Sequence, residues 1–66
     1  MDGIDDIVQQ AIAYTDDLLS RSPGHYQIAR DGLQRMRENL AQGAADHPAL
    51  GRLDAYIADL ESRFTH

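Results

Sequence analysis

The stretch IDDIVQQAIAYTDDLL, residues 4–19, has the widest apolar face in the chain and is expected to decide the fold. At about 100° per residue of an α-helix, its aliphatic side chains gather on one side, and its aspartates and glutamines gather on the other. The apolar side carries Ile4, Ile7, Val8, Ala11, Ile12, Thr15, Leu18 and Leu19, with Tyr14 at its margin. This division predicts an amphipathic helix that the rest of the chain must cover.

Start and stop signals predict three helices, at residues 3–21, 23–42 and 48–64. Asp2 is the expected N-cap of the first helix, and a Ser-Pro-Gly sequence interrupts that helix at its end. Ser22 is the expected N-cap of the second helix, with a proline at the first helical position. Gly43 is expected to end the second helix in the left-handed conformation, and Asp46 or His47 is expected to cap the third.

The second and third predicted helices each carry a narrow apolar stripe, built on alternating three- and four-residue steps. The stripes consist of Tyr26, Ala29, Leu33, Met36 and Leu40, and of Leu50, Leu53, Ile57, Leu60 and Phe64. Ile28 points away from its stripe, and solvent is the expected environment for an isolated apolar residue of this kind. Two narrow stripes facing a broad one predict an all-α fold, a small antiparallel three-helix bundle with up-down-up topology in a single domain of residues 1–66. Two copies of such a small bundle could also assemble into a larger helical bundle as a dimer.

Charged residues at equal spacing flank the stripes of the second and third helices. Arg30 and Arg37 are seven residues apart, and so are Asp54 and Glu61. In an antiparallel pair of helices, Arg37 is expected near Asp54, and Arg30 near Glu61, as complementary flanks of one seam. Four solvated charges without partners are an equally good alternative.

The residues that usually carry enzyme or metal chemistry are few and badly placed. The chain has no cysteine, and its serines fall at helix ends, where hydroxyls usually cap helices or face water. The topology places His47 about 28 Å from the end that His25 and His66 share, so the three histidines cannot form one site. A site of His25 and His66 with a carboxylate is less expected than capping or loop histidines. The sequence therefore predicts no enzyme activity, no metal site and no cofactor.

The charge of the chain bears on its partners and its location. The formal net charge is −5, and all six basic residues are arginines. Such an acidic chain is expected to repel nucleic acid and anionic membrane surfaces, so direct binding to either is disfavoured. No stretch is apolar enough to span a bilayer, and the first residues do not resemble a signal peptide. A cytoplasmic location is expected.

Four aspartates form an acidic face on the first predicted helix. Asp5 and Asp16 make one column along the helix, and Asp6 and Asp17 make a second, each about 16 Å long. This face could dock a basic patch on a protein partner, although solubility is the favoured explanation of such a surface. The apolar margin residues that two narrow neighbours could leave uncovered are Ile12, Tyr14, Leu19 and Tyr56.

Well-specified helical faces without chemistry predict a small, non-enzymatic protein-interaction module. Regulators, inhibitors, antitoxins and immunity proteins are often acidic chains of this size, which is an analogy of class. The expected partner-binding residues are Asp5, Asp6, Asp16, Asp17, Ile12, Tyr14 and Tyr56. The alternative is a homo-oligomeric assembly module with no separate ligand.

Overall fold

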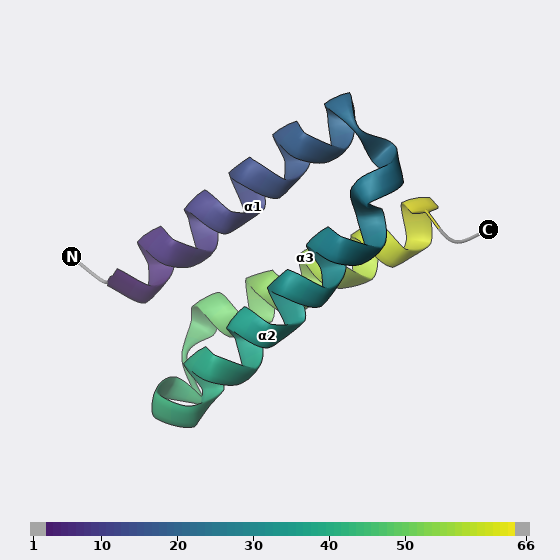
Figure 1. Cartoon of the computed structure of the whole chain (residues 1–66). Helices are drawn as coiled ribbons and strands as arrows, with labels where there is room; N and C mark the ends of the chain where they lie inside the picture. The colour runs from purple at the N-terminus through teal and green to yellow at the C-terminus, as the bar shows by residue number, and fades with distance from the viewer. Residues whose placement is uncertain (1–2, 65–66) are drawn as a thin grey trace.

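The computed structural model describes residues 3–64 and shows a three-helix bundle (Figure 1). Its elements are α1 (Gly3–Arg21), the 3₁₀ turn η1 (Pro23–His25), α2 (Tyr26–Ala44) and α3 (Pro48–Phe64). Consecutive helices run antiparallel, so the predicted all-α fold with up-down-up topology is confirmed. All three helices fall within two residues of the predicted ranges, except that the second begins as a separate turn.

The connection between α1 and α2 differs from the predicted capped helix start. The Ser22 side chain makes no capping hydrogen bond. Its carbonyl oxygen instead accepts a hydrogen bond of 3.0 Å from the backbone N–H of His25, which closes the 3₁₀ turn η1. The α-helical hydrogen-bonding pattern begins only at Tyr26. The predicted cap of α1, Asp2, lies outside the described residues.

The prediction that Gly43 ends the second helix is wrong. Gly43 lies inside α2, and no residue of the described chain has a positive φ. The chain leaves α2 through Ala45 in the right-handed region, at φ −57°. The N–H of His47 then donates to the carbonyl oxygen of Ala44 at 3.0 Å, so the turn needs no left-handed residue.

His47 caps α3, as the sequence predicted for this position or Asp46. The backbone N–H of Ala49 donates to Nδ1 of His47 at 3.0 Å. The backbone N–H of Leu50 also donates to the carbonyl oxygen of His47, at 3.1 Å. Two of the free N–H groups at the start of α3 are thereby satisfied.

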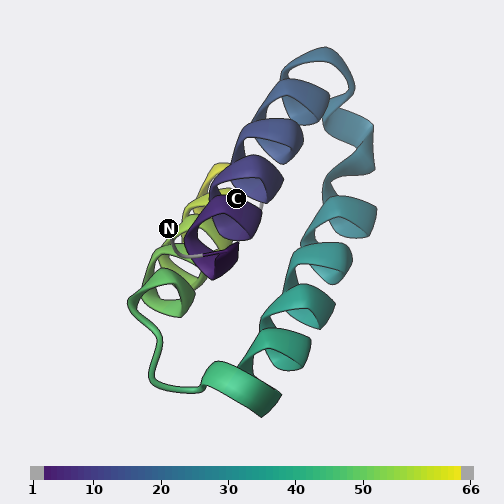
Figure 2. The same cartoon turned by 90° about the vertical axis from the view of Figure 1, so that its left-hand side faces the viewer.

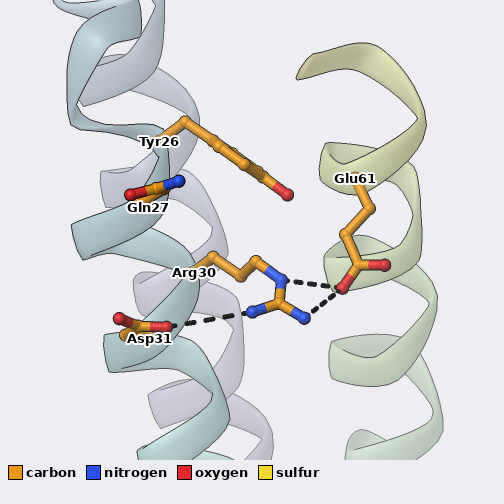
Figure 3. Close-up of a pocket in the computed structure, with 5 residues that line it drawn as sticks. All are labelled: Tyr26, Gln27, Arg30, Asp31 and Glu61. Carbon is orange, nitrogen blue, oxygen red and sulfur yellow. Dashed lines mark hydrogen bonds and ion pairs between the residues drawn. The ribbon is translucent and has the colours of Figure 1, made fainter. Parts of the chain in front are cut away.

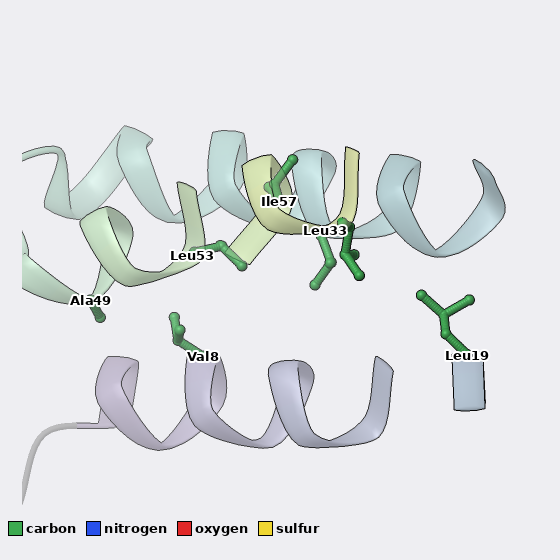
Figure 4. Close-up of a cluster of buried hydrophobic side chains, with 7 residues drawn as sticks. Val8, Leu19, Leu33, Ala49, Leu53 and Ile57 are labelled. Carbon is green, nitrogen blue, oxygen red and sulfur yellow. The ribbon is translucent and has the colours of Figure 1, made fainter. Parts of the chain in front are cut away.

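The core is centred on α3, whereas the width of the apolar faces predicted a core centred on the first helix. Five residues of α3 are buried, against three of α1 and one of α2. Figure 4 shows Val8 of α1 and Leu33 of α2 directed toward Leu53 and other residues of α3. Leu19, expected at an uncovered margin, belongs to this core with 5% of its surface exposed. The reason is that α1 packs chiefly against α3 and only partly against α2.

Both flanks of α3 carry ion pairs, and the two flanks have opposite charge. On the α2 side, Nε of Arg37 donates to Asp54 at 2.5 Å, and Nε of Arg30 donates to Glu61 at 2.7 Å. Both predicted pairings are therefore confirmed. Each hydrogen bond raises the pKa of its arginine, because the carboxylate stabilises the charged guanidinium.

On the α1 side the cations belong to α3 itself. Arg52 is bonded to Asp5, and Nη2 of Arg63 lies 3.8 Å from a carboxylate oxygen of Asp16. Since α1 and α3 run in the same direction, the eleven-residue spacing of the two aspartates matches that of the two arginines. These two pairs thus specify how far α1 is shifted along α3.

Candidate functional site

An apolar groove separates α1 from α2 on the side of the bundle away from α3. It encloses about 340 Å³. Figure 2 shows the two helices joined at one end through η1, with α3 behind α1. The groove is lined by Ala11, Tyr14, Thr15 and Leu18 of α1, and by His25, Ile28, Ala29, Gly32, Leu33 and Met36 of α2.

Small residues at facing positions leave this groove open. Ala11 of α1 and Ala29 and Gly32 of α2 line it, and none of them has a side chain longer than a methyl group. A Cβ atom added to Gly32 would meet no heavy atom within 4 Å. The helices therefore approach without filling the space between them, while Thr15 and Leu33 form the buried floor.

Large apolar side chains stand exposed along this face. Tyr14 is 69% exposed and Ile28 is 72% exposed, and the two lie on opposite sides of the groove. Ile7, which is 49% exposed, precedes Tyr14 by seven residues and so lies on the same side of α1, two turns away. The prediction that Ile28 is exposed is confirmed, but Ile28 is part of a patch and not an isolated residue.

Arg35 is the arginine without an ion pair among residues 3–64. The other arginines, each bonded to or near a carboxylate, are Arg21, Arg30, Arg37, Arg52 and Arg63. Arg35 follows Ile28 by seven residues, which places it on the same exposed side of α2 beside the groove. A cation on the outer flank of an apolar groove is suited to recognising an acidic group on whatever fills the groove.

The predicted acidic face of α1 divides into two columns with different surroundings. Asp5 and Asp16 lie on the α3 side and have arginine partners there. Asp6 and Asp17 lie on the outer flank, next to the exposed apolar residues of the α1–α2 face. Asp17 pairs with Arg21 one turn later, and Asp6 has no ion pair among the described residues. Docking through any of the four stays a prediction.

The remaining predicted site residues lie away from the groove, between α1 and α3. Ile12 and Tyr56 are half-buried and pack against the core. Tyr56 Oη is buried without a hydrogen-bond partner in the described chain. Burial raises the pKa of Tyr56, and the nearby carboxylate of Asp16 raises it further, while Arg63 lowers it. Of the three apolar residues predicted to bind a partner, Tyr14 is exposed, and Ile12 and Tyr56 are half-buried.

A second, polar pocket of about 400 Å³ lies at the end of the α2–α3 seam (Figure 3). It is lined by Tyr26, Gln27, Arg30, Asp31 and Glu61. Arg30 spans it, with Nε and Nη2 both 2.7 Å from Oε1 of Glu61 and Nη1 3.8 Å from Asp31. Because its cation already faces two carboxylates, this pocket is poorly suited to an anionic ligand. Its residues hold the seam together.

The histidines do not converge. His25 lies at the edge of the groove, His47 caps α3 at the opposite end of the bundle, and His66 lies outside the described residues. Residues 3–64 hold no group of three or more histidine, cysteine, aspartate or glutamate side chains that could bind a metal ion. Within the same residues, no helix combines the length and the apolarity needed to cross a membrane.

Comparison with protein-family models, with curated proteins and with solved structures found no match to this chain. The groove was not predicted from the sequence, although one signal for it was present. Ala11, Ala29 and Gly32 are too small to fill the space between α1 and α2. The α1–α3 ion pairs were also missed, although the spacing of Asp5 and Asp16 equals that of Arg52 and Arg63.

Proposed function

We propose that the chain is a non-enzymatic protein-interaction module whose α1–α2 groove receives the apolar face of a helix. The observation that carries the proposal is the pair Tyr14 and Ile28, which stand 69% and 72% exposed on the two sides of one apolar groove. A helix laid along a hydrophobic groove is a common way for small helical proteins to bind partners.

Burial of this face supplies the driving force. Full burial of an isoleucine side chain stabilises a complex by roughly 1.5–3 kcal/mol. Ile28, Tyr14 and Ile7 are the large apolar residues most exposed in the described chain, and all three lie on this face. Tyrosine contributes a large contact area at a small cost in side-chain entropy, which favours it at the centre of interfaces.

The charges beside the groove set the chemistry of the bound helix. Asp6 and Asp17 on the flank of α1 favour basic residues on the adjacent edge of the ligand. Arg35 on the flank of α2 favours an acidic residue on the other edge. The partner predicted to have a basic surface thus becomes a helix with basic residues along one edge. A regulatory or inhibitory role and a cytoplasmic location remain part of the proposal.

Site-specific photocrosslinking in the organism that encodes the chain tests this proposal. The photoreactive residue p-benzoylphenylalanine replaces Tyr14 in one variant and the exposed Gln9 in a control. Gln9 lies on the same helix but points away from the groove. We expect a discrete adduct, identified by mass spectrometry, from position 14 only. No adduct at position 14, or equal labelling from position 9, would refute the proposal.

A further inference from the structure

We infer that the helix received by the groove belongs to a second copy of this chain. In the proposed dimer, α1 of each copy lies over α2 of the other, so the two exposed apolar strips cover each other. The inference rests on the proposed function and deepens it by naming the ligand. It is carried by the arrangement of charge and small residues on the α1–α2 face.

A two-fold axis parallel to the helices generates this dimer. It places α1 of one copy antiparallel to α2 of the other, the same orientation that the two helices have within one chain. Tyr14 and Gly32 line the same groove and so lie at similar heights along the bundle. The rotation therefore brings Tyr14 over the second copy's Gly32, beside its Ile28, where the missing side chain leaves room for an aromatic ring.

The charges on the flanks agree with this axis. Asp6 and Asp17 lie on the outer flank of α1, and the unpaired Arg35 lies on the outer flank of α2. When α1 lies over the second copy's α2, these two flanks meet along both edges of the interface. Arg35 is level with Gln10 and Ala11, between the heights of the two aspartates, and a long arginine side chain reaches toward either.

The same charges oppose the other simple dimer. A two-fold axis perpendicular to the helices would place α1 over α1 and α2 over α2. Asp6 and Asp17 of one copy would then face the same aspartates of the other, and like charges at an interface disfavour association. The face is thus self-complementary in one arrangement and repulsive in the other.

The face is also large enough for a stable dimer. It spans two helices of nineteen residues each, so its outline is about 28 Å by 20 Å, roughly 560 Å² before the ruggedness of the side chains is counted. Two such faces together bury about 1,100 Å², which exceeds the roughly 1,000 Å² in total that a specific interface needs. A chain of 66 residues, which buries little surface alone, gains most from such an association.

Sedimentation equilibrium of the purified chain, from micromolar to millimolar concentration, tests this inference. We expect wild-type dimer at the higher concentrations. Ile28→Glu should raise the dissociation constant at least tenfold. Gln27→Glu on the same helix is the control, because Gln27 is exposed and lines the α2–α3 pocket instead of the groove, and it should leave the dissociation constant within about twofold. Circular dichroism confirms that each variant keeps its helices.

Charge exchange tests the predicted contacts. Arg35→Glu should weaken the dimer about tenfold at low salt and less at high salt, because it faces Asp6 and Asp17 of the second copy. Adding Asp6→Arg and Asp17→Arg to the same chain should restore most of the loss.

The outcomes separate this inference from the proposed function. A wild-type monomer at every concentration overturns the dimer, and so does a dimer that Ile28→Glu leaves intact. In either case, an adduct between position 14 and a different protein would preserve the proposed function. Crosslinking of position 14 to a second copy supports both, and no adduct at all contradicts both.

Discussion

The α2–α3 seam and the α1–α2 groove both lie between antiparallel helices with apolar faces, but the seam is closely packed and the groove is open. The seam is closed by Leu33, Ile57 and Leu60, and two arginine–carboxylate pairs flank it. Across the groove, facing small residues leave about 340 Å³ open, and no ion pair joins α1 to α2 in residues 3–64. The difference shows that the large side chains and the interhelical ion pairs of α1 and α2 are directed toward α3, so the apolar face between α1 and α2 stays exposed.

Truncation of one leucine in the core and one leucine in the groove should give the largest difference in the free energy of unfolding. Leu53 is fully buried, so Leu53→Ala should destabilise the fold by about 3 kcal/mol through lost burial and a cavity. Leu18 already lines open space, so Leu18→Ala should cost only about 1 kcal/mol. Urea denaturation of dilute samples, followed by circular dichroism, measures both. Equal losses would show that the groove is as well packed as the core.

Removal of the Tyr56 hydroxyl tests how well the α1–α3 seam accommodates a buried polar group. Because Tyr56 Oη is buried without a hydrogen-bond partner in the described residues, Tyr56→Phe should stabilise the fold by about 1 kcal/mol. Burial raises the pKa of Tyr56, so the unfolded chain ionises first as the pH rises past the ordinary value of 10.0. Wild-type stability should fall above that pH, and Tyr56→Phe should fall less.

Thermal unfolding between neutral pH and pH 11 measures this effect. Tyr14→Phe is the matched control, since Tyr14 is exposed and its hydroxyl is not buried on folding. The control variant should lose stability with rising pH as the wild type does. If Tyr56→Phe loses stability with rising pH as steeply as the wild type, the raised pKa of Tyr56 is not the cause of the loss.

Replacement of Gly32 or Gly51 by alanine tests whether a second copy packs on the groove. Neither Gly32 in α2 nor Gly51 in α3 has a heavy atom within 4 Å of an added Cβ. Alanine at either position should stabilise dilute chain by about 0.5–1 kcal/mol through helix propensity. At high concentration, Gly32→Ala should weaken the proposed dimer, and Gly51→Ala should not. Equal sedimentation of both variants would contradict close packing on Gly32.

Reversing single charges should give the smallest effects. Arg52→Glu places a carboxylate beside Asp5, so the melting temperature should fall by a few degrees at low salt, and Asp5→Arg in the same chain should recover it. Arg35 has no carboxylate partner among residues 3–64, so Arg35→Glu should leave the melting temperature of dilute samples nearly unchanged. A larger loss from Arg35→Glu than from Arg52→Glu would contradict this difference.

The fold and the α2–α3 seam could be predicted from the sequence because their signals are local or repeat regularly. Helix ends follow from Pro23 and Pro48, and the pairing of Arg30 with Glu61 and of Arg37 with Asp54 follows from two equal spacings. His47 as a cap also follows from its position beside a proline.

The dominance of α3 and the open groove could not be predicted in the same way. A helical projection gives the angular width of an apolar face, but it does not say how closely each neighbour approaches that face. Leu19 was therefore expected at an uncovered margin, and Ile28 was expected to stand alone. Distances between helices depend on the sizes of facing side chains, and these become known only when the register of α1 against α2 is known.

The opposite charges on the two flanks of α3 also favour one handedness of the bundle. Three antiparallel helices can turn either way around their common axis, and burial of the apolar stripes alone barely distinguishes the two. In a bundle of the opposite hand, each helix would turn its other flank toward α3. Asp54 and Glu61 would then lose Arg37 and Arg30, and Arg52 and Arg63 would lose Asp5 and Asp16. The four ion pairs thus favour the observed hand over its mirror image, although each pair adds little to stability.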